Sequence, residues 1–329
     1  MKRRLSLLAF ILCQFIGWLA AATVTAQAQN LRAATSSSYV ERGNQWHAKG
    51  EYERALADFG LAIASDPSND MAYYNRATTQ YQLKAYERAL ADFTRALQLN
   101  PRLVEAYVNR GSVRYILGDF DGVLSDCNKA IELNPKLALA WGNRGLARGG
   151  KGDFAGALTD FDRAVQLGLR NAEIYNNRGV MRYKLGDDDG AIRDQTQAIK
   201  LQPNFVEAWS CRGAARQLKG DLEGALADYN QAIKLNPQFH DAWFNRATYW
   251  KAKGDLVRAE AEFTQAVEIN PRVAQTYGQR GLMRLLQGRA DDAERDFVRC
   301  LELDKDLKES LERRIAEANQ QLKKRGPLR

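Results

Sequence analysis

Histidine, the side chain most often used for metal binding and for proton transfer, is rare in this chain of 329 residues. The two histidines, His47 and His240, lie far apart in the sequence. A metal centre built from several histidines is therefore excluded, and so is a duplicated histidine-based active site. We expect no metal site, no cofactor and no catalytic residue in this protein.

Residues 145–152 read GLARGGKG and match the pattern of a phosphate-binding loop as far as Lys151. Gly152 stands where a serine or threonine would hold magnesium, and no predicted strand precedes the motif. The motif instead falls within a predicted helix and the turn that follows it. We therefore expect no nucleotide to bind here.

Side chains that carry an amide recur along the chain at intervals of 34 residues or multiples of 34. An amide has one acceptor and two donors, so it can pair with both polar groups of a peptide unit without reading its sequence. We interpret these residues and the tyrosines near them as candidate peptide-binding residues; the alternative is that the amides brace a neighbouring arginine. The candidates are Asn75, Asn109, Asn143, Asn177, Asn245, Gln279, Tyr74, Tyr81, Tyr115 and Tyr183.

The same period of 34 residues governs most of the chain. The fourth position of every unit is aromatic, the eighth is glycine or alanine, and a small residue follows twelve positions later, as in Tyr73, Ala77 and Ala89. Spacings of three, four and seven residues predict helices, and glycine-containing breaks predict two helices per unit. The units begin at residues 36, 70, 104, 138, 172, 206, 240 and 274, and six of them carry proline near their end: Pro67, Pro101, Pro135, Pro203, Pro237 and Pro271.

At these residues the chain resembles the tetratricopeptide repeat family. The resemblance implies an all-α fold: a right-handed α-solenoid superhelix of stacked antiparallel helix pairs, whose first helices line a concave groove and whose last repeat is covered by a C-terminal capping helix. The predicted organisation is a signal peptide at 1–28, a linker at 29–35, eight repeats over 36–307, a capping helix at 308–322 and a basic tail at 323–329. The repeats are 36–69, 70–103, 104–137, 138–171, 172–205, 206–239, 240–273 and 274–307.

The resemblance also implies a function. The sixth position of the repeat faces the groove in this family, and asparagines there can form a ladder that holds an extended peptide. Members that clamp a C-terminal carboxylate need cations where this chain has Val40, Glu105 and Asn109, so we do not expect such a clamp. We expect a protein-binding scaffold that is not an enzyme; a cryptic enzyme that uses groove residues remains an alternative. The oligomeric state stays open.

Charged residues and cysteines have structural interpretations in this repeat. Arginine at position 7 and an acidic residue at position 23 occur in every unit, as in Arg144 and Asp160, which predicts an ion pair within each repeat. Cys127, Cys211 and Cys300 fall in three separate repeats, too far apart for a disulfide. We expect Cys127 and Cys300 to be buried and Cys211 to be accessible from the groove.

The N-terminus predicts export. Lys2, Arg3 and Arg4 precede an apolar stretch, and Ala26-Gln27-Ala28 fits a signal-peptidase site, so we expect a mature chain that begins near Gln29 in the periplasm or outside a bacterial cell. The alternative is a membrane-tethered assembly adaptor that keeps this segment as an anchor, and the mass of the mature N-terminus separates the two.

Residues 36–307 carry equal numbers of basic and acidic side chains, so nucleic acid is not an expected partner.

Overall fold

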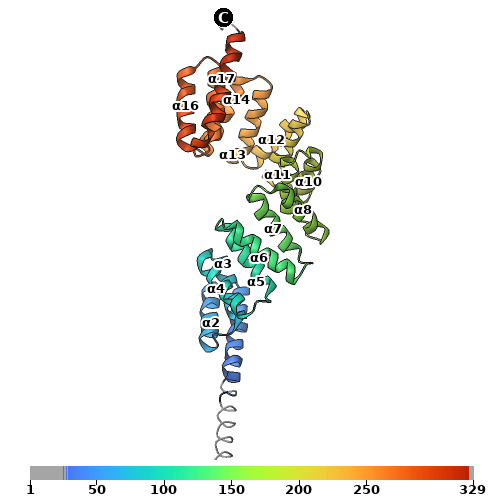
Figure 1. Cartoon of the computed structure of the whole chain (residues 1–329), viewed down its shortest axis with the longest axis vertical. Coiled ribbons are helices and arrows are strands. Elements are labelled where there is room, and N and C mark those ends of the chain that lie inside the picture. Colours follow the sequence, from blue (N-terminus) through green and yellow to red (C-terminus); the bar gives the residue numbers. More distant parts are fainter. Residues whose placement is uncertain (1–24, 26, 28, 326–329) are drawn as a thin grey trace, which may run out of the picture. The chain divides into compact units, whose positions relative to one another are not determined.

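The computed structural model describes residues 25, 27 and 29–325, and all regular secondary structure among them is helical. The chain divides into two compact units, one ending at Gly168 and the other beginning at Leu169. Within each unit, consecutive antiparallel helices pack as pairs, and the pairs stack on one another (Figure 1). The expected all-α solenoid of stacked helix pairs is confirmed.

The first unit contains the N-terminal helical stretch, residues 29–48, and seven further helices. These are α2 (Tyr52–Ser65), α3 (Asp70–Gln82), α4 (Tyr86–Leu99), α5 (Val104–Ile116), α6 (Phe120–Leu133), α7 (Ala138–Gly150) and α8 (Phe154–Gln166). Helices α3, α5 and α7 begin at the first position of the repeats expected there. Residues 145–150, the start of the loop-like glycine motif, lie inside α7, as the sequence predicts.

The second unit contains eight helices in four pairs, followed by a short 3-10 turn and a long final helix. They are α9 (Ala172–Lys184), α10 (Asp188–Leu201), α11 (Val206–Leu218), α12 (Leu222–Leu235), α13 (His240–Ala252), α14 (Leu256–Ile269), α15 (Ala274–Leu286), α16 (Ala290–Leu303), η1 (Lys305–Leu307) and α17 (Lys308–Arg325). The final helix packs on α15 and ends three residues beyond the expected boundary at 322.

Local chemistry sets the ends of these helices. Asp153 accepts a hydrogen bond from the backbone N–H of Gly156 and so caps α8, and the same arrangement recurs at Asp119, Asp187 and Asp221. The residue before each cap turns the chain between the two helices with a positive φ, which glycine adopts without strain, as at Gly152 (φ 84°). Lys84 makes this turn at φ 59° and is the one residue other than glycine with a positive φ in the described part of the chain.

The small residue at position 8 of the first helix packs against positions 20 and 24 of the second helix. A Cβ added at Gly213 would lie 3.2 Å from the backbone oxygen of Ala225, at position 20. A Cβ added at Gly145 would lie 2.9 Å from the ring of Phe161, which occupies position 24. Phe59, Phe93 and Tyr229 are buried at the same position of their repeats. The ring of the second helix therefore requires the small residue of the first.

The structure tests only part of the organisation predicted for the N-terminus. Residues 29–35, predicted as a linker, are helical and continue directly into the first helix of the first repeat. This segment contains no glycine or proline, and alanine, leucine and arginine favour helix. The predicted signal peptide falls almost entirely on residues outside the described part of the chain. No helix among the described residues is both long and apolar enough to span a bilayer.

Candidate functional site

The first unit presents a row of two pockets between its first helices. The pocket between α3 and α5 has a volume of about 170 Å³ and is lined by Thr78, Tyr81, Gln82, Phe93, Asn109 and Ser112. The pocket between α5 and α7 has a volume of about 130 Å³ and is lined by Tyr81, Ser112, Tyr115, Ile116, Asn143 and Leu146. We call these two the tandem pockets. Four of the residues predicted from the sequence, Tyr81, Tyr115, Asn109 and Asn143, line them.

Tyr81 and Ser112 line both tandem pockets, so the two pockets adjoin. Aromatic packing fixes the walls: Tyr81 meets Tyr86 edge to face with ring centroids 5.9 Å apart, and Tyr115 meets Phe120 in the same way at 5.7 Å. Tyr115 nevertheless keeps 40% of its surface exposed, and the neighbouring Ile116 keeps 47%. The row therefore offers apolar surface to a ligand on a rigid support.

The amides of the groove bond to the preceding first helix. Asn109 donates from Nδ2 to the Tyr74 hydroxyl (3.0 Å), and Asn143 donates from Nδ2 to the Ser112 hydroxyl (3.2 Å). Neither side chain pairs with an arginine, so the bracing alternative is wrong for these two residues. Each amide keeps its oxygen and its second N–H without a partner among the described residues. The side chain of Asn75 makes no hydrogen bond there.

The second unit continues the pattern less regularly. Asn245 donates to the Ser210 hydroxyl at 3.0 Å, and the Gln279 oxygen accepts from the Lys251 ammonium at 2.9 Å. The Asn177 oxygen lies 3.5 Å from the amide nitrogen of Asn176, at the limit of a hydrogen bond. Phe244, the residue before Asn245, packs edge to face against the buried Phe263 and stacks on the ring of His240.

Cys211 interrupts the amide series at position 6 of its repeat. It is half-buried, and burial, followed by the negative charges of Asp241 and Glu207, raises its pKa to about 12. Tyr183 lies nearby, and its own pKa is raised by burial and then by Asp188. Cys127 and Cys300 are buried, as expected, and the described cysteines are all free thiols.

The raised pKa of Cys211 predicts slow alkylation of the folded protein. Only the thiolate reacts, and an unfolded cysteine has a pKa of about 8.5, so at pH 8 iodoacetamide should modify native Cys211 on the order of 100-fold more slowly than the urea-unfolded chain. The native rate should keep rising above pH 9, where the unfolded rate levels off. Peptide mass spectrometry at a series of pH values measures both. A native rate that levels off near pH 9 would contradict the raised pKa.

The predicted ion pair within each repeat is confirmed. In seven repeats the position-7 arginine donates from Nε and Nη2 to both oxygens of the position-23 aspartate, with Nη2–Oδ1 distances of 2.5–2.8 Å. Arg246 donates from Nε to Glu262 at 2.8 Å in the remaining repeat. All eight arginines also lie over the aromatic ring three residues earlier, 4.6–5.8 Å from its centroid. These arginines therefore join the two helices of each repeat.

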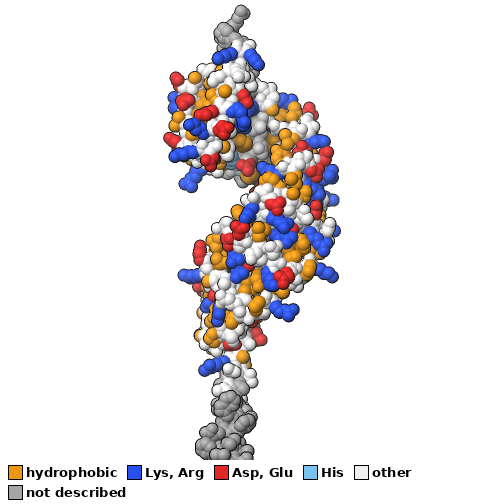
Figure 2. Space-filling model, viewed as in Figure 1, with side chains coloured by type: hydrophobic (Ala, Val, Ile, Leu, Met, Phe, Trp, Pro, Cys, Tyr) orange, Lys and Arg blue, Asp and Glu red, His pale blue; other side chains and the backbone are white. Residues whose placement is uncertain are grey.

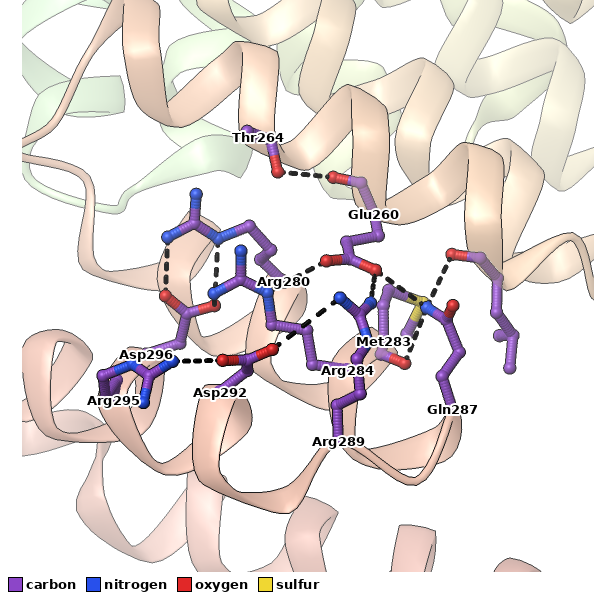
Figure 3. Close-up of polar contacts among 11 residues, drawn as sticks. Glu260, Thr264, Arg280, Met283, Arg284, Gln287, Arg289, Asp292, Arg295 and Asp296 are labelled. Carbon is purple, nitrogen blue, oxygen red and sulfur yellow. Dashed lines mark hydrogen bonds and ion pairs between the residues drawn. The ribbon is translucent and has the colours of Figure 1, made fainter. Parts of the chain in front are cut away.

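A second arginine shares the same carboxylate, and sequence reasoning missed it. Arg148 donates from Nη1 to Asp160 at 2.9 Å, and position 11 supplies the equivalent residue in four other repeats: Arg114, Arg182, Arg216 and Arg284. Figure 3 shows the last of these clusters, in which Arg280 and Arg284 both reach Asp296, while Arg284 and Arg289 also reach Glu260. The recurrence of arginine at position 11 was the sequence signal that could have revealed it.

The histidines connect neighbouring repeats. The ring Nδ1 of His47 lies 2.8 Å from the Thr79 hydroxyl, and the ring Nε2 of His240 lies 2.9 Å from the Thr276 hydroxyl. The described residues contain no cluster of histidine, cysteine and acidic side chains with the spacing of a metal site. Acidic and basic side chains are interspersed on the face shown in Figure 2, without a large patch of one sign.

The comparisons with known proteins agree with this geometry. Family models described as "Tetratricopeptide repeat" match residues 71–103, 104–137 and 143–209, and one described as "TPR repeat" matches residues 43–84 and 217–253. No match was found among curated proteins.

Solved structures share the fold. A tetratricopeptide repeat protein from Parabacteroides merdae is 20% identical, with a TM-score of 0.59 over 76% of this chain and 99% of that one. A chain in the crystal structure of the APC/C hetero-tetramer Cut9–Hcn1 is 15% identical, with a TM-score of 0.62 over 80% of this chain and 52% of that one. Pseudomonas aeruginosa pilF is 17% identical, with a TM-score of 0.59 over 66% of this chain and 99% of that one.

Proposed function

Because the chain belongs to the tetratricopeptide repeat family, whose members are protein–protein interaction scaffolds, we propose that it holds an extended segment of a partner protein along the first helices of its first unit. The observation that carries this proposal is the pair of tandem pockets, which adjoin through Tyr81 and Ser112. The partner segment is a polypeptide, and the scaffold performs no chemistry on it.

The spacing of the tandem pockets fits an extended chain. Neighbouring helices pack about 10 Å apart, and an extended peptide rises about 3.3 Å per residue, so successive pockets would take side chains about three residues apart. The amide oxygens of Asn109 and Asn143, which also line these pockets, have no hydrogen-bond partner among the described residues. Each can accept a backbone N–H of the segment, while the second amide N–H donates to a carbonyl.

The lining of the tandem pockets also sets the chemistry of the segment. It contains hydroxyl, amide, aromatic and aliphatic side chains but no charged one. We infer that the segment places uncharged apolar side chains in the pockets, and that salt affects its binding little. Burial of two such side chains, at about 1.5–3 kcal/mol each, supplies most of the favourable free energy.

Removing the two groove amides should weaken peptide binding while leaving the fold intact. A library of fluorescent nonapeptides screened by polarisation would supply a ligand, and Asn109→Ala/Asn143→Ala should weaken its binding by about 1–3 kcal/mol, or about 5- to 150-fold. The matched control is Gln98→Ala, since Gln98 is exposed on the second helix α4. Unchanged affinity in a double mutant with wild-type circular dichroism would reject the amide ladder.

We also propose that the protein acts outside the cytoplasm of a bacterial cell. The support is the basic and apolar N-terminal segment with its small-residue cleavage pattern. A mature chain that begins near Gln29 excludes the tethered adaptor, whereas a chain that retains residues 5–26 favours it.

A further inference from the structure

A third pocket lies in the second unit, between α13, α15 and the final helix α17. Its volume is about 280 Å³, larger than either tandem pocket. Leu256, Leu282, Leu286 and Ala318 form its apolar lining. The side chains that distinguish it are two cations, Lys251 and Arg314, which project from different helices. We call it the α17 pocket.

The α17 pocket occupies the same place in the repeat as the tandem pockets but has a different chemistry. Lys251 stands at position 12 of its first helix, where Tyr81 and Tyr115 stand in the first unit. Helix α17, whose Leu311 and Ala318 are buried against α15, supplies part of the lining here. Two cations and a carboxylate thus line this pocket, whereas the lining of the tandem pockets carries no charge.

Neither cation of the α17 pocket makes an ion pair among the described residues, although the Glu317 carboxylate lies in the same pocket. Lys251 is half-buried and donates to the neutral amide oxygen of Gln279, whereas Arg314 is exposed. Burial lowers the pKa of Lys251, and the positive charge of Arg314 lowers it further, against the smaller opposite effect of Glu317. A partly desolvated ammonium with a cation as its neighbour is stabilised when an anion binds beside it.

The remaining lining restricts which anion fits. Glu317 also lines the pocket, and its carboxylate repels a doubly charged phosphate more strongly than a singly charged group. The leucines favour an aliphatic group next to the charge. The volume lies just below the usual range of small-molecule sites, about 300–1,000 Å³, so the ligand is short.

We propose that the α17 pocket binds a single carboxylate carried on a short aliphatic stem. The carboxylate lies between the Lys251 ammonium and the Arg314 guanidinium, and the stem packs on Leu282 and Leu286. Both a free short-chain acid and a glutamate side chain of a polypeptide have this chemistry. The proposal does not depend on peptide binding in the first unit.

Calorimetric titration of the full chain with hexanoate, and with uncharged hexanamide of the same length, tests this proposal. Hexanoate should bind saturably at one site, and hexanamide about tenfold or more weakly, because charge-assisted hydrogen bonds to both cations are lost. Lys251→Met keeps the stem of the lysine and removes its charge, and it should weaken hexanoate about tenfold or more; Arg314→Gln should act in the same direction. The matched controls, Lys253→Met and Arg313→Gln, change exposed neighbours outside the pocket and should leave binding unchanged.

Two acetylated and amidated tripeptides, Leu-Glu-Leu and Leu-Gln-Leu, identify the source of the carboxylate. Tighter binding of Leu-Glu-Leu than of hexanoate assigns the pocket to an acidic residue of a polypeptide, and the reverse order assigns it to a free acid. The proposal is overturned if hexanoate and hexanamide bind equally, if hexanoate does not bind saturably, or if Lys253→Met weakens binding as much as Lys251→Met.

Discussion

Asp160→Asn is expected to lower the free energy of unfolding by about 3–5 kcal/mol. The Asp160 side chain is fully buried and accepts hydrogen bonds from Arg144 Nε (2.9 Å), Arg144 Nη2 (2.7 Å) and Arg148 Nη1 (2.9 Å). Asparagine has nearly the same volume, so no cavity forms. It removes the negative charge shared by two guanidinium groups and turns an amide N–H toward one of them, which leaves a partly buried cation without its partner.

The urea unfolding midpoint, followed by far-UV circular dichroism, measures this effect. Asp121→Asn is the matched control: it also removes an aspartate paired with a cation, Lys151, but Asp121 is 81% exposed. An exposed pair contributes about 0–1 kcal/mol, so the control should unfold close to the wild type. Equal midpoints for the two variants would show that the buried cluster does not hold α7 to α8.

The sequence predicted the first arginine of this cluster because the pattern has no exception. Arginine at position 7 and an acidic residue at position 23 occur in all eight repeats. These positions lie on the first and second helices of a repeat, which must pack together, so the arginine and the carboxylate are expected to form an ion pair. The second arginine escaped prediction because position 11 is not uniform: it is Trp46, Gln80 and Trp250 in three repeats. Trp46 nevertheless donates to Asp58 at 3.1 Å, so different side chains perform one task.

The sequence predicts which residues lie in the groove but not the hydrogen bonds that they form. Helical phase, together with the resemblance to a known family, placed Tyr81, Tyr115, Asn109 and Asn143 in the groove, and these four residues line the tandem pockets. Their hydrogen bonds to the preceding helix depend on side-chain rotamers and on the distance between neighbouring first helices, which no periodicity specifies. The α17 pocket depends on the path of the last helix across α15. The amphipathic pattern of 308–322 predicted a cap but not the pocket that this helix lines.

Gly213→Ala is expected to destabilise the protein although alanine favours helix over glycine by about 1 kcal/mol. The added Cβ would lie 2.7 Å from Cε1 of Tyr229 and 3.2 Å from the backbone oxygen of Ala225. The Tyr229 ring is buried, and its hydroxyl donates to Gln217 at 3.0 Å, so the ring is held at both ends and cannot move aside. Overpacking of this kind costs about 1–3 kcal/mol and exceeds the gain in helix propensity.

Gly111→Ala, at the same position of another repeat, should have the opposite effect. Cys127 replaces the aromatic ring there, and the nearest atom to an added Cβ, the Cys127 sulfur, is 3.7 Å away, an ordinary van der Waals distance. The gain in helix propensity is then unopposed and should stabilise the protein by about 0.5–1 kcal/mol. Urea unfolding of both variants beside the wild type measures the two signs. If both alanines stabilise, the ring at position 24 is not what requires glycine at position 8; if both destabilise, contact with the backbone of the second helix is the reason instead.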